Sequence, residues 1–297
     1  MCGIFGMINY SKENLTTWRI QELQKLIANL LDESEMRGKD ASGICILSED
    51  KVSIFKDHIR GRDLKNYKLF KDVVDNINIT NRFKSLLGHT RAQTKGDSRF
   101  NINNHPIIAN KTIGVHNGII GNDDLLFSKH KDKIVREGEV DSEIIFRLID
   151  MYIAEGKSIE DAVKETSDQL LGGYACAFIN LDWSNYLTLF KGSTYPSIVI
   201  YTYNFDNLIV FASSSIILSN AIKDLTVFDE SSVTEKLEIG KSQGVRINID
   251  DGGIYAFDLE EAESCNSRNY GINGGPCTTC ELEQCLKCPH FATEAVF

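Results

Sequence analysis

The residue with the most distinctive chemistry stands at position 2. Cys2 directly follows the initiator Met1, and a small side chain at this position normally permits removal of the methionine. The mature chain would then begin with a thiol and a free α-amine on the same residue. Because an α-amino group titrates at a pH of about 7.7–8.0, it can accept the thiol proton near neutral pH. This pair predicts a nucleophile that attacks an amide carbonyl and forms an acyl-enzyme.

The residues after Cys2 help to distinguish a functional N-terminus from an accidental Met-Cys start. Residues 3–9, GIFGMIN, form an apolar run that predicts a buried strand. Most chain termini are polar and frayed, and burying a charged terminus costs free energy. We therefore expect this terminus to have a role.

The rest of the chain predicts α+β architecture. A capped helical stripe follows Thr16, and residues 43–47 and 52–55 indicate a hairpin, whereas residues 57–85 indicate only loose helix. Residues 86–121 are rich in Gly, Asn, His and Thr, which is typical of loops that carry chemistry. Helices are predicted from Asp141 and from Ser158. Strands are predicted at residues 174–180, 186–190, 197–201, 208–212, 244–249 and 253–257, with a short helix after Ser214. This order favours largely antiparallel sheets.

Composition excludes some classes of protein. The formal net charge of −10 argues against a broad nucleic-acid-binding surface. No run of about eighteen apolar residues is present, so no membrane span or membrane partner is expected. The first fourteen residues lack a basic leader, and we expect a cytoplasmic protein.

Six motifs occur in a characteristic order along the chain: CGIFG, RGKDASG, GHTRAQT, NNHP, VHNGIIGN and VDSE. Together they resemble the class II glutamine amidotransferases of the N-terminal-nucleophile hydrolase superfamily, and most of all the glutaminase domain of glucosamine-6-phosphate synthase. The resemblance implies a four-layer αββα sandwich of two antiparallel sheets. We assign this domain to residues 2–262.

The resemblance also implies catalytic roles. Cys2 would be the nucleophile, with its α-amine as general base. The side-chain amide of Asn117 and the backbone N–H of Gly118 would form the oxyanion hole. Donors aimed at a developing oxyanion suit an amide substrate, since the loss of one typically lowers the rate by about 10²–10³.

The resemblance implies that three further residues bind the charged α-amino and α-carboxylate groups of zwitterionic L-glutamine. Arg91 would grip the α-carboxylate, Thr94 would lie nearby as a weaker contact, and Asp141 would hold the α-ammonium. Arginine matches a carboxylate bidentately, and a carboxylate matches an ammonium. Two structural alternatives remain open: Asp141 could be the N-cap of the following helix, and Arg91 an ordinary ion-pair residue.

Other residues in the motifs are interpreted as framework. Arg37 and Asp40 are expected to form an internal structural pair. His89, His105 and His116 are expected to be hydrogen-bonded framework residues rather than metal ligands, because no metal-binding spacing supports them.

The sequence departs from the family pattern at two positions. Ala92 stands where the synthase branch carries a Trp that covers the site and helps to gate ammonia. The gating mechanism of that branch therefore does not carry over to this chain, whereas the hydrolysis does not depend on this position. Gly121 stands where the family has Glu, so the surrounding loop cannot be copied directly from the family.

Residues 263–297 form a Cys-rich tail. Two CxxC pairs could hold structural Zn²⁺ or, as a less favoured alternative, an iron–sulfur cluster, with Cys265 and His290 as possible substitute ligands; free or redox-active thiols are the third alternative. The pairs are Cys277, Cys280, Cys285 and Cys288. Catalysis itself needs no cofactor.

The sequence thus predicts a stand-alone glutaminase subunit that passes ammonia to a separate partner synthetase, because only about 35 residues follow the glutaminase body. Two alternatives remain. One is an N-terminal-nucleophile hydrolase acting on a different amide, and the other is a non-catalytic scaffold on the same fold.

Overall fold

The computed structural model describes residues 1–13, 15–49, 51–75 and 83–259. The proposed boundary at residue 262 and the Cys-rich tail with its metal-ligand candidates lie outside these described residues. The description below concerns the body of the chain.

Two antiparallel sheets form the centre of the molecule. The first has the strand order β11-β9-β10-β1-β4-β2-β3, and the second has the order β13-β12-β8-β7-β6-β5. The first contains β1 (Gly3–Asn9), β2 (Ala41–Ser48), β3 (Val52–Asp57), β4 (Phe83–Arg91), β9 (Val199–Tyr203), β10 (Leu208–Ala212) and β11 (Glu235–Glu238). The second contains β5 (Ile107–Ala109), β6 (Thr112–Ile120), β7 (Gly172–Asn180), β8 (Tyr186–Lys191), β12 (Gln243–Asn248) and β13 (Ile254–Asp258).

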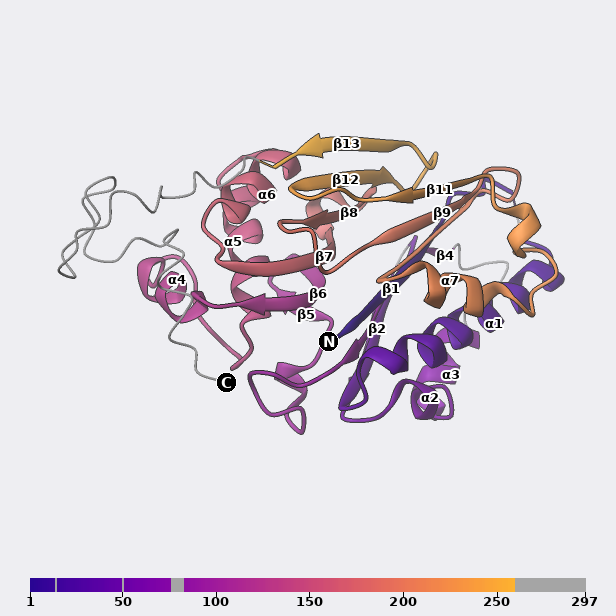
Figure 1. Ribbon diagram of the computed structural model, residues 1–297, viewed down its shortest axis with the longest axis horizontal. Coiled ribbons are helices and arrows are strands. Elements are labelled where there is room, and N and C mark those ends of the chain that lie inside the picture. The colour runs from indigo at the N-terminus through magenta and orange to yellow at the C-terminus, as the bar shows by residue number, and fades with distance from the viewer. Residues whose placement is uncertain (14, 50, 76–82, 260–297) are drawn as a thin grey trace.

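Helices cover the two outer faces of this pair of sheets (Figure 1). The first sheet is covered by α1 (Thr17–Ser34), α2 (Gly61–Leu64), α3 (Lys68–Asp75) and α7 (Ser215–Ile222). The second is covered by α5 (Ser142–Ala154) and α6 (Ile159–Ser167), with α4 (Asp123–Lys129) beside α5. Short 3-10 turns occur at Glu35–Arg37, Asn101–Asn103, Leu181–Trp183 and Glu230–Ser232.

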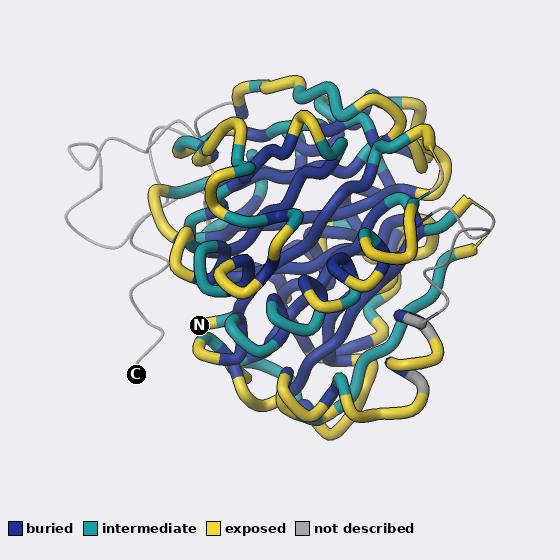
Figure 2. The backbone as a smooth tube through the Cα atoms, turned by 90° about the vertical axis from the view of Figure 1, so that its right-hand side faces the viewer, coloured by how far each residue is buried: buried dark blue, intermediate teal, exposed yellow. Residues whose placement is uncertain are grey.

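Strand β1 shows why its sequence is a continuous apolar run. Phe5 and Met7 pack into the core beneath α1 and α7, whereas Ile4 and Ile8 pack into the core between the sheets. Successive side chains of a strand point to opposite faces, so a strand with a layer on each side is apolar at every position. Figure 2 shows the resulting buried backbone running through both sheets.

The predicted α+β sandwich of two antiparallel sheets between helical layers is confirmed. The loop-like interpretation of residues 86–121 is correct for residues 92–106, which form a loop with a 3-10 turn, but wrong for the residues on either side, which belong to the strands β4, β5 and β6. Their glycines make close packing possible. A Cβ on Gly88 would lie 2.2 Å from the ring of Phe5, and one on Gly114 would lie 2.0 Å from the ring of Phe146. The glycines that imitate a loop therefore make room for aromatic rings.

The described ranges contain no helix that combines the length and the apolar character needed to cross a bilayer.

Candidate active site

A pocket of about 300 Å³ opens beside the N-terminus, where β1 and β4 of the first sheet contact β6 of the second. Four of the predicted catalytic and substrate-binding residues line it: Cys2, Thr94, Asn117 and Gly118. Much of the remaining wall is apolar. The sandwich therefore brings a thiol from one sheet to face an amide side chain from the other.

Cys2 is positioned by the pairing of β1 with β4, in which Gly3 lies opposite Thr90. The backbone nitrogen of Ala92, just beyond β4, donates to the Cys2 Sγ at 3.4 Å, and the thiol lies 3.5 Å from the Ala92 carbonyl oxygen. Burial raises the pKa of the Cys2 thiol, and Asp141 raises it further, while the Ala92 N–H, the N-terminal ammonium and Arg91 act in the opposite direction. The thiol therefore needs a base to accept its proton at neutral pH.

Met1 also lines the pocket, and the Tyr195 hydroxyl lies 2.7 Å from its Sδ. While Met1 is attached, the nitrogen of Cys2 is part of an amide and cannot accept a proton. Removal of Met1 would open space in the pocket and convert this nitrogen into an amine next to the thiol.

Asn117, on β6, is completely buried, yet neither its Nδ2 nor its Oδ1 has a hydrogen-bond partner in the described part of the chain. An unpaired buried polar group costs about 1–3 kcal/mol, so such a group calls for an explanation. Because Asn117 lines the pocket, a ligand carbonyl is the natural acceptor for its Nδ2.

Gly118, the next residue, has a φ of +144°, and a Cβ there would lie 2.0 Å from the Gly173 carbonyl oxygen on β7. Only glycine fits this position. It places a second backbone segment at the pocket wall beside the Asn117 amide.

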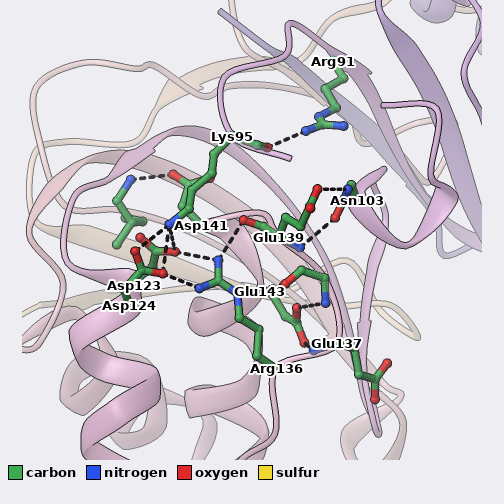
Figure 3. A network of polar contacts seen from close by, with 12 residues as sticks. Arg91, Lys95, Asn103, Asp123, Asp124, Arg136, Glu137, Glu139, Asp141 and Glu143 are labelled. Atoms are coloured by element: carbon green, nitrogen blue, oxygen red, sulfur yellow. Dashed lines mark hydrogen bonds and ion pairs between the residues drawn. The ribbon is translucent and has the colours of Figure 1, made fainter. Parts of the chain in front are cut away.

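Arg91 ends β4 and is buried behind the pocket rather than lining it. Its Nη1 donates to the Asn104 Oδ1 at 2.9 Å. Its Nη2 donates to the carbonyl oxygen of Lys95 (Figure 3) and to that of Gly96, both at 2.7 Å. A guanidinium has five N–H donors, and these three contacts use only its two terminal nitrogens. Arg91 is thus held by the loop that follows it and keeps part of its donor capacity for a ligand.

Asp141 directly precedes α5 and is also buried outside the pocket lining. Asp141 occupies the N-cap position of α5, as the structural alternative expected, but its side chain makes no capping hydrogen bond to the helix. Instead, the Asp141 Oδ2 accepts a hydrogen bond from the Ile120 nitrogen at 2.7 Å, at the end of the strand that carries Asn117. The Asp141 carboxylate therefore accepts a hydrogen bond from a residue 21 positions earlier in the chain rather than from the first turn of α5, which the sequence around Asp141 does not reveal.

Arg37 and Asp40 do not form an ion pair with each other in the described structure, so that expectation is wrong. The Arg37 Nε donates to the Cys2 carbonyl oxygen at 2.9 Å, and the Asp40 Oδ2 accepts from the Gln93 nitrogen at 2.7 Å. Arg37 thus contacts the backbone of the nucleophile candidate, whereas Asp40 contacts the segment between Ala92 and Thr94.

The three histidines form a buried framework behind the pocket. The rings of His89 and His105 stack at 4.0 Å, His89 Nε2 lies 3.0 Å from the His116 carbonyl oxygen, and His116 Nδ1 lies 2.8 Å from Ser142 Oγ. Burial lowers the pKa of all three, that of His89 to about 3. Within the described residues, His105 has no hydrogen-bond partner at either ring nitrogen, so only His89 and His116 form the expected hydrogen bonds. Across the described ranges, no cluster of three His, Cys, Asp or Glu residues is arranged for a metal ion.

Sequence reasoning missed two residues at the site. Asn104 lies in the NNHP motif, and its role as the Arg91 acceptor could have been suspected from that position. Tyr195 lines the pocket from the β8–β9 connection, and its hydroxyl lies 3.2 Å from the Arg37 Nη2. No local pattern marks Tyr195, because its place depends on how the two sheets stack.

The chain has sequence relatives among known proteins. No family model matches the chain. The glutamine–fructose-6-phosphate aminotransferase (isomerizing) of Geobacillus kaustophilus is 32% identical over 187 residues, covering 62% of this chain and 28% of the relative. The enzyme of that name from Halalkalibacterium halodurans is 28% identical over 261 residues, covering 87% of this chain and 38% of the relative. The chain thus spans roughly a third of the length of these relatives.

Two solved structures share the fold. Glutamine phosphoribosylpyrophosphate amidotransferase from B. subtilis matches with a TM-score of 0.62 at 19% identity, covering 87% of this chain and 49% of that chain. A glutamine aminotransferase class-II domain protein from Silicibacter pomeroyi matches with a TM-score of 0.55 at 14% identity, covering 88% and 100%.

The two stacked antiparallel sheets between helical layers are the fold that this chain shares with these amidotransferase structures. The sequence relatives narrow this similarity further. The chain is homologous to part of the glutamine–fructose-6-phosphate aminotransferases, and its fold is similar to that of a glutamine aminotransferase class-II domain protein.

Proposed function

We propose that this domain hydrolyses L-glutamine to L-glutamate and ammonia through a γ-glutamyl thioester on Cys2. The observation that carries the proposal is the unpaired, fully buried amide of Asn117 in the same pocket as the Cys2 thiol. A nucleophile and a vacant donor facing one space suit attack on a carbonyl carbon whose oxygen becomes negatively charged.

The proposed reaction uses the α-amine of Cys2 after removal of Met1. The amine accepts the thiol proton, and sulfur attacks the side-chain carbonyl of glutamine. Asn117 Nδ2 and the Gly118 N–H donate to the oxyanion. The C–N bond then breaks, ammonia leaves with the proton held by the amine, and a thioester remains. Water attacks the thioester with the amine again as base, and glutamate is released as the thiol is restored.

Substrate recognition is proposed to use Arg91 for the α-carboxylate, Thr94 as a further contact at the pocket wall, and Asp141 for the α-ammonium. Buried charges are unfavourable unless they are paired, and each of these ions would gain a partner of opposite charge from the substrate. Arg91 has five N–H donors, of which three contact protein acceptors, and Asp141 has a second carboxylate oxygen besides the Oδ2 that accepts from Ile120. Both side chains therefore suit these roles.

The decisive experiment compares glutamate release by the wild type, Cys2→Ala and Cys45→Ala. Cys45 is a matched control because its thiol is buried between the sheets, where burial raises its pKa to about 12. We expect full activity for Cys45→Ala and none for Cys2→Ala. Activity retained in Cys2→Ala would overturn the proposal. Turnover of another amide but not of glutamine would favour the alternative amidohydrolase. Cellular function that is fully retained in Cys2→Ala would favour the non-catalytic scaffold.

Ammonia is proposed to pass to a separate synthetase subunit in the cytoplasm. Co-purification with the full chain, followed by an assay of glutamine-dependent amidation by the captured protein, tests this step. With Ala92 half-buried at the pocket, any gating of ammonia must rely on residues other than a Trp at that position.

The Cys-rich tail is proposed, from sequence alone, to hold structural Zn²⁺ through Cys277, Cys280, Cys285 and Cys288. Elemental analysis of the purified full chain should find about one zinc per chain. Absence of stoichiometric zinc together with stoichiometric iron would favour the cluster alternative, and absence of both would remove the metal site.

A further inference from the structure

The loop of residues 92–98 contributes both to the pocket and to the surroundings of Arg91. Thr94 lines the pocket, while the carbonyl oxygens of Lys95 and Gly96 accept from the Arg91 Nη2. The orientation of Arg91 therefore depends on where this loop places two backbone carbonyls.

The side chain of Lys95 extends from this loop to the start of α4. Its Nζ lies 2.6 Å from the Asp123 Oδ2 and 3.0 Å from the Asp124 Oδ1 (Figure 3). Arg136 pairs with the same two carboxylates and also donates to the carbonyl oxygens of Gly138 and Glu139. Partial burial alone would lower the pKa of Lys95, but Asp123 and Asp124 raise it above its usual value, so the ammonium stays charged.

Backbone contacts on both sides of Lys95 hold the rest of the loop. The Gln93 nitrogen donates to Asp40, and the Asp97 nitrogen donates to the Glu139 Oε2 at 3.2 Å. Between these two points, Lys95 supplies the side-chain anchor to α4. Loss of this anchor would free the two carbonyls that hold Arg91 without disturbing either end of the loop.

We propose that Lys95 is a positioning residue for recognition of the substrate α-carboxylate, acting through its ion pairs with Asp123 and Asp124 to hold Arg91. This inference rests on the proposed function, because it assumes that Arg91 binds glutamine. Lys95 makes two separate contacts: its ammonium pairs with carboxylates of α4, and its backbone carbonyl accepts a hydrogen bond from the proposed recognition residue Arg91.

The chemistry at Cys2 does not depend on this anchor. Cys2 is held by β1 and Ala92, and Asn117 is held within β6, so both remain in place when Lys95 changes. Removing Lys95 should therefore weaken binding of the amino-acid head and leave the nucleophile intact. Buried Asp123 keeps its pair with Arg136, so the substitution leaves no unpaired buried charge to unfold the domain.

The experiment compares Lys95→Met, Lys95→Arg and the control Lys133→Met, which removes an equally charged side chain from an exposed pair with Glu155. For each, KM and kcat for L-glutamine are measured, together with the rate at which iodoacetamide alkylates Cys2, followed on the N-terminal peptide. Iodoacetamide lacks the amino-acid head, so its rate reports the nucleophile alone.

We expect Lys95→Met to raise KM about tenfold with kcat and the alkylation rate nearly unchanged, because only binding of the head group is weakened. Lys95→Arg should restore most of the affinity, and Lys133→Met should behave as wild type. An unchanged KM, or an alkylation rate that falls in step with activity, would overturn the inference.

A second variant, Asp124→Asn, keeps the inference testable if Lys95→Met is poorly folded. The Asp124 side chain is 73% exposed, so folding should be preserved. Asp124→Asn should raise KM less than Lys95→Met does. The difference in KM between this variant and the wild type should shrink as salt is added, because salt screens the exposed ion pair of the wild type. An unchanged KM in this variant too would contradict the inference. Failure of the proposed function is distinguishable, since it would appear as a wild type that does not hydrolyse glutamine at all.

Discussion

The carboxylate of Asp141 accepts a hydrogen bond from the backbone nitrogen of Ile120 at 2.7 Å, which joins the start of α5 to the end of β6. The same strand carries Asn117 and Gly118, so the residue proposed to hold the substrate ammonium is fixed relative to the proposed oxyanion donors. One rigid unit of strand and helix can therefore set the distance between the site for the α-ammonium of glutamine and the site for its side-chain carbonyl oxygen.

The charge of Asp141 can be removed while its shape is kept. Asp141→Asn should weaken glutamine binding by about 10–100-fold, because a charge-assisted hydrogen bond is worth about 1.5–3 kcal/mol. Asp141 raises the pKa of the Cys2 thiol, so the variant should also shift the pH midpoint of Cys2 alkylation downward. Steady-state kinetics and a pH series of alkylation check both effects. An upward shift of the midpoint would contradict the electrostatic account.

The unpaired amide of Asn117 should favour catalysis at the expense of stability. Asn117→Ala should lower kcat by about 10²–10³, since one oxyanion donor is lost. Its Tm should stay the same or rise, because the variant removes a buried polar group that has no partner. Calorimetry and kinetics on one preparation decide this, and a clear drop in Tm would indicate that Asn117 is a structural residue.

The conformation of Gly118 predicts a strong effect of a single methyl group. Gly118→Ala should destabilise the fold by about 2 kcal/mol or more, because its φ is +144° and a Cβ would lie 2.0 Å from the Gly173 oxygen. Gly121→Ala is the matched control, since its Cβ would meet nothing closer than 3.7 Å. Urea unfolding should separate the two variants, and equal stabilities would argue against the strand geometry at Gly118.

The buried histidines predict a loss of stability in acid. Burial lowers the pKa of His89, His105 and His116 below the value of 6.5 that they have when exposed. The unfolded chain therefore binds more protons below pH 6.5, and stability should fall as the pH falls through that value, by about 1.4 kcal/mol per pH unit for each histidine. Urea unfolding across about pH 4–7 measures the slope. His105→Gln should reduce the slope by about one proton, and an unchanged slope would contradict the assignment for His105.

The sequence predicted much of the pocket but little of the support around it. Cys2, Thr94, Asn117 and Gly118 line one cavity as expected, because each belongs to a short motif whose residue types suit one reaction. The strands that carry Arg91 and Asn117 were not predicted. Glycines at positions 88 and 114 resemble loop residues in sequence, whereas their function is to admit aromatic rings from other segments.

The contacts made by the proposed substrate-recognition residues were also not predicted, for a physical reason. The loop carbonyls that hold Arg91, the contact between Asp141 and Ile120, and the place of Tyr195 all join segments distant in sequence or use backbone atoms. Residue type does not encode which backbone carbonyl a side chain will meet. Such contacts follow only from the stacking of the two sheets.

The most direct test is mass spectrometry of the protein quenched in acid during turnover of L-glutamine. The account predicts an N-terminal peptide that begins at Cys2 and carries a γ-glutamyl group on its sulfur. Fully active protein that retains Met1, or an acyl group found on a different residue, would contradict it.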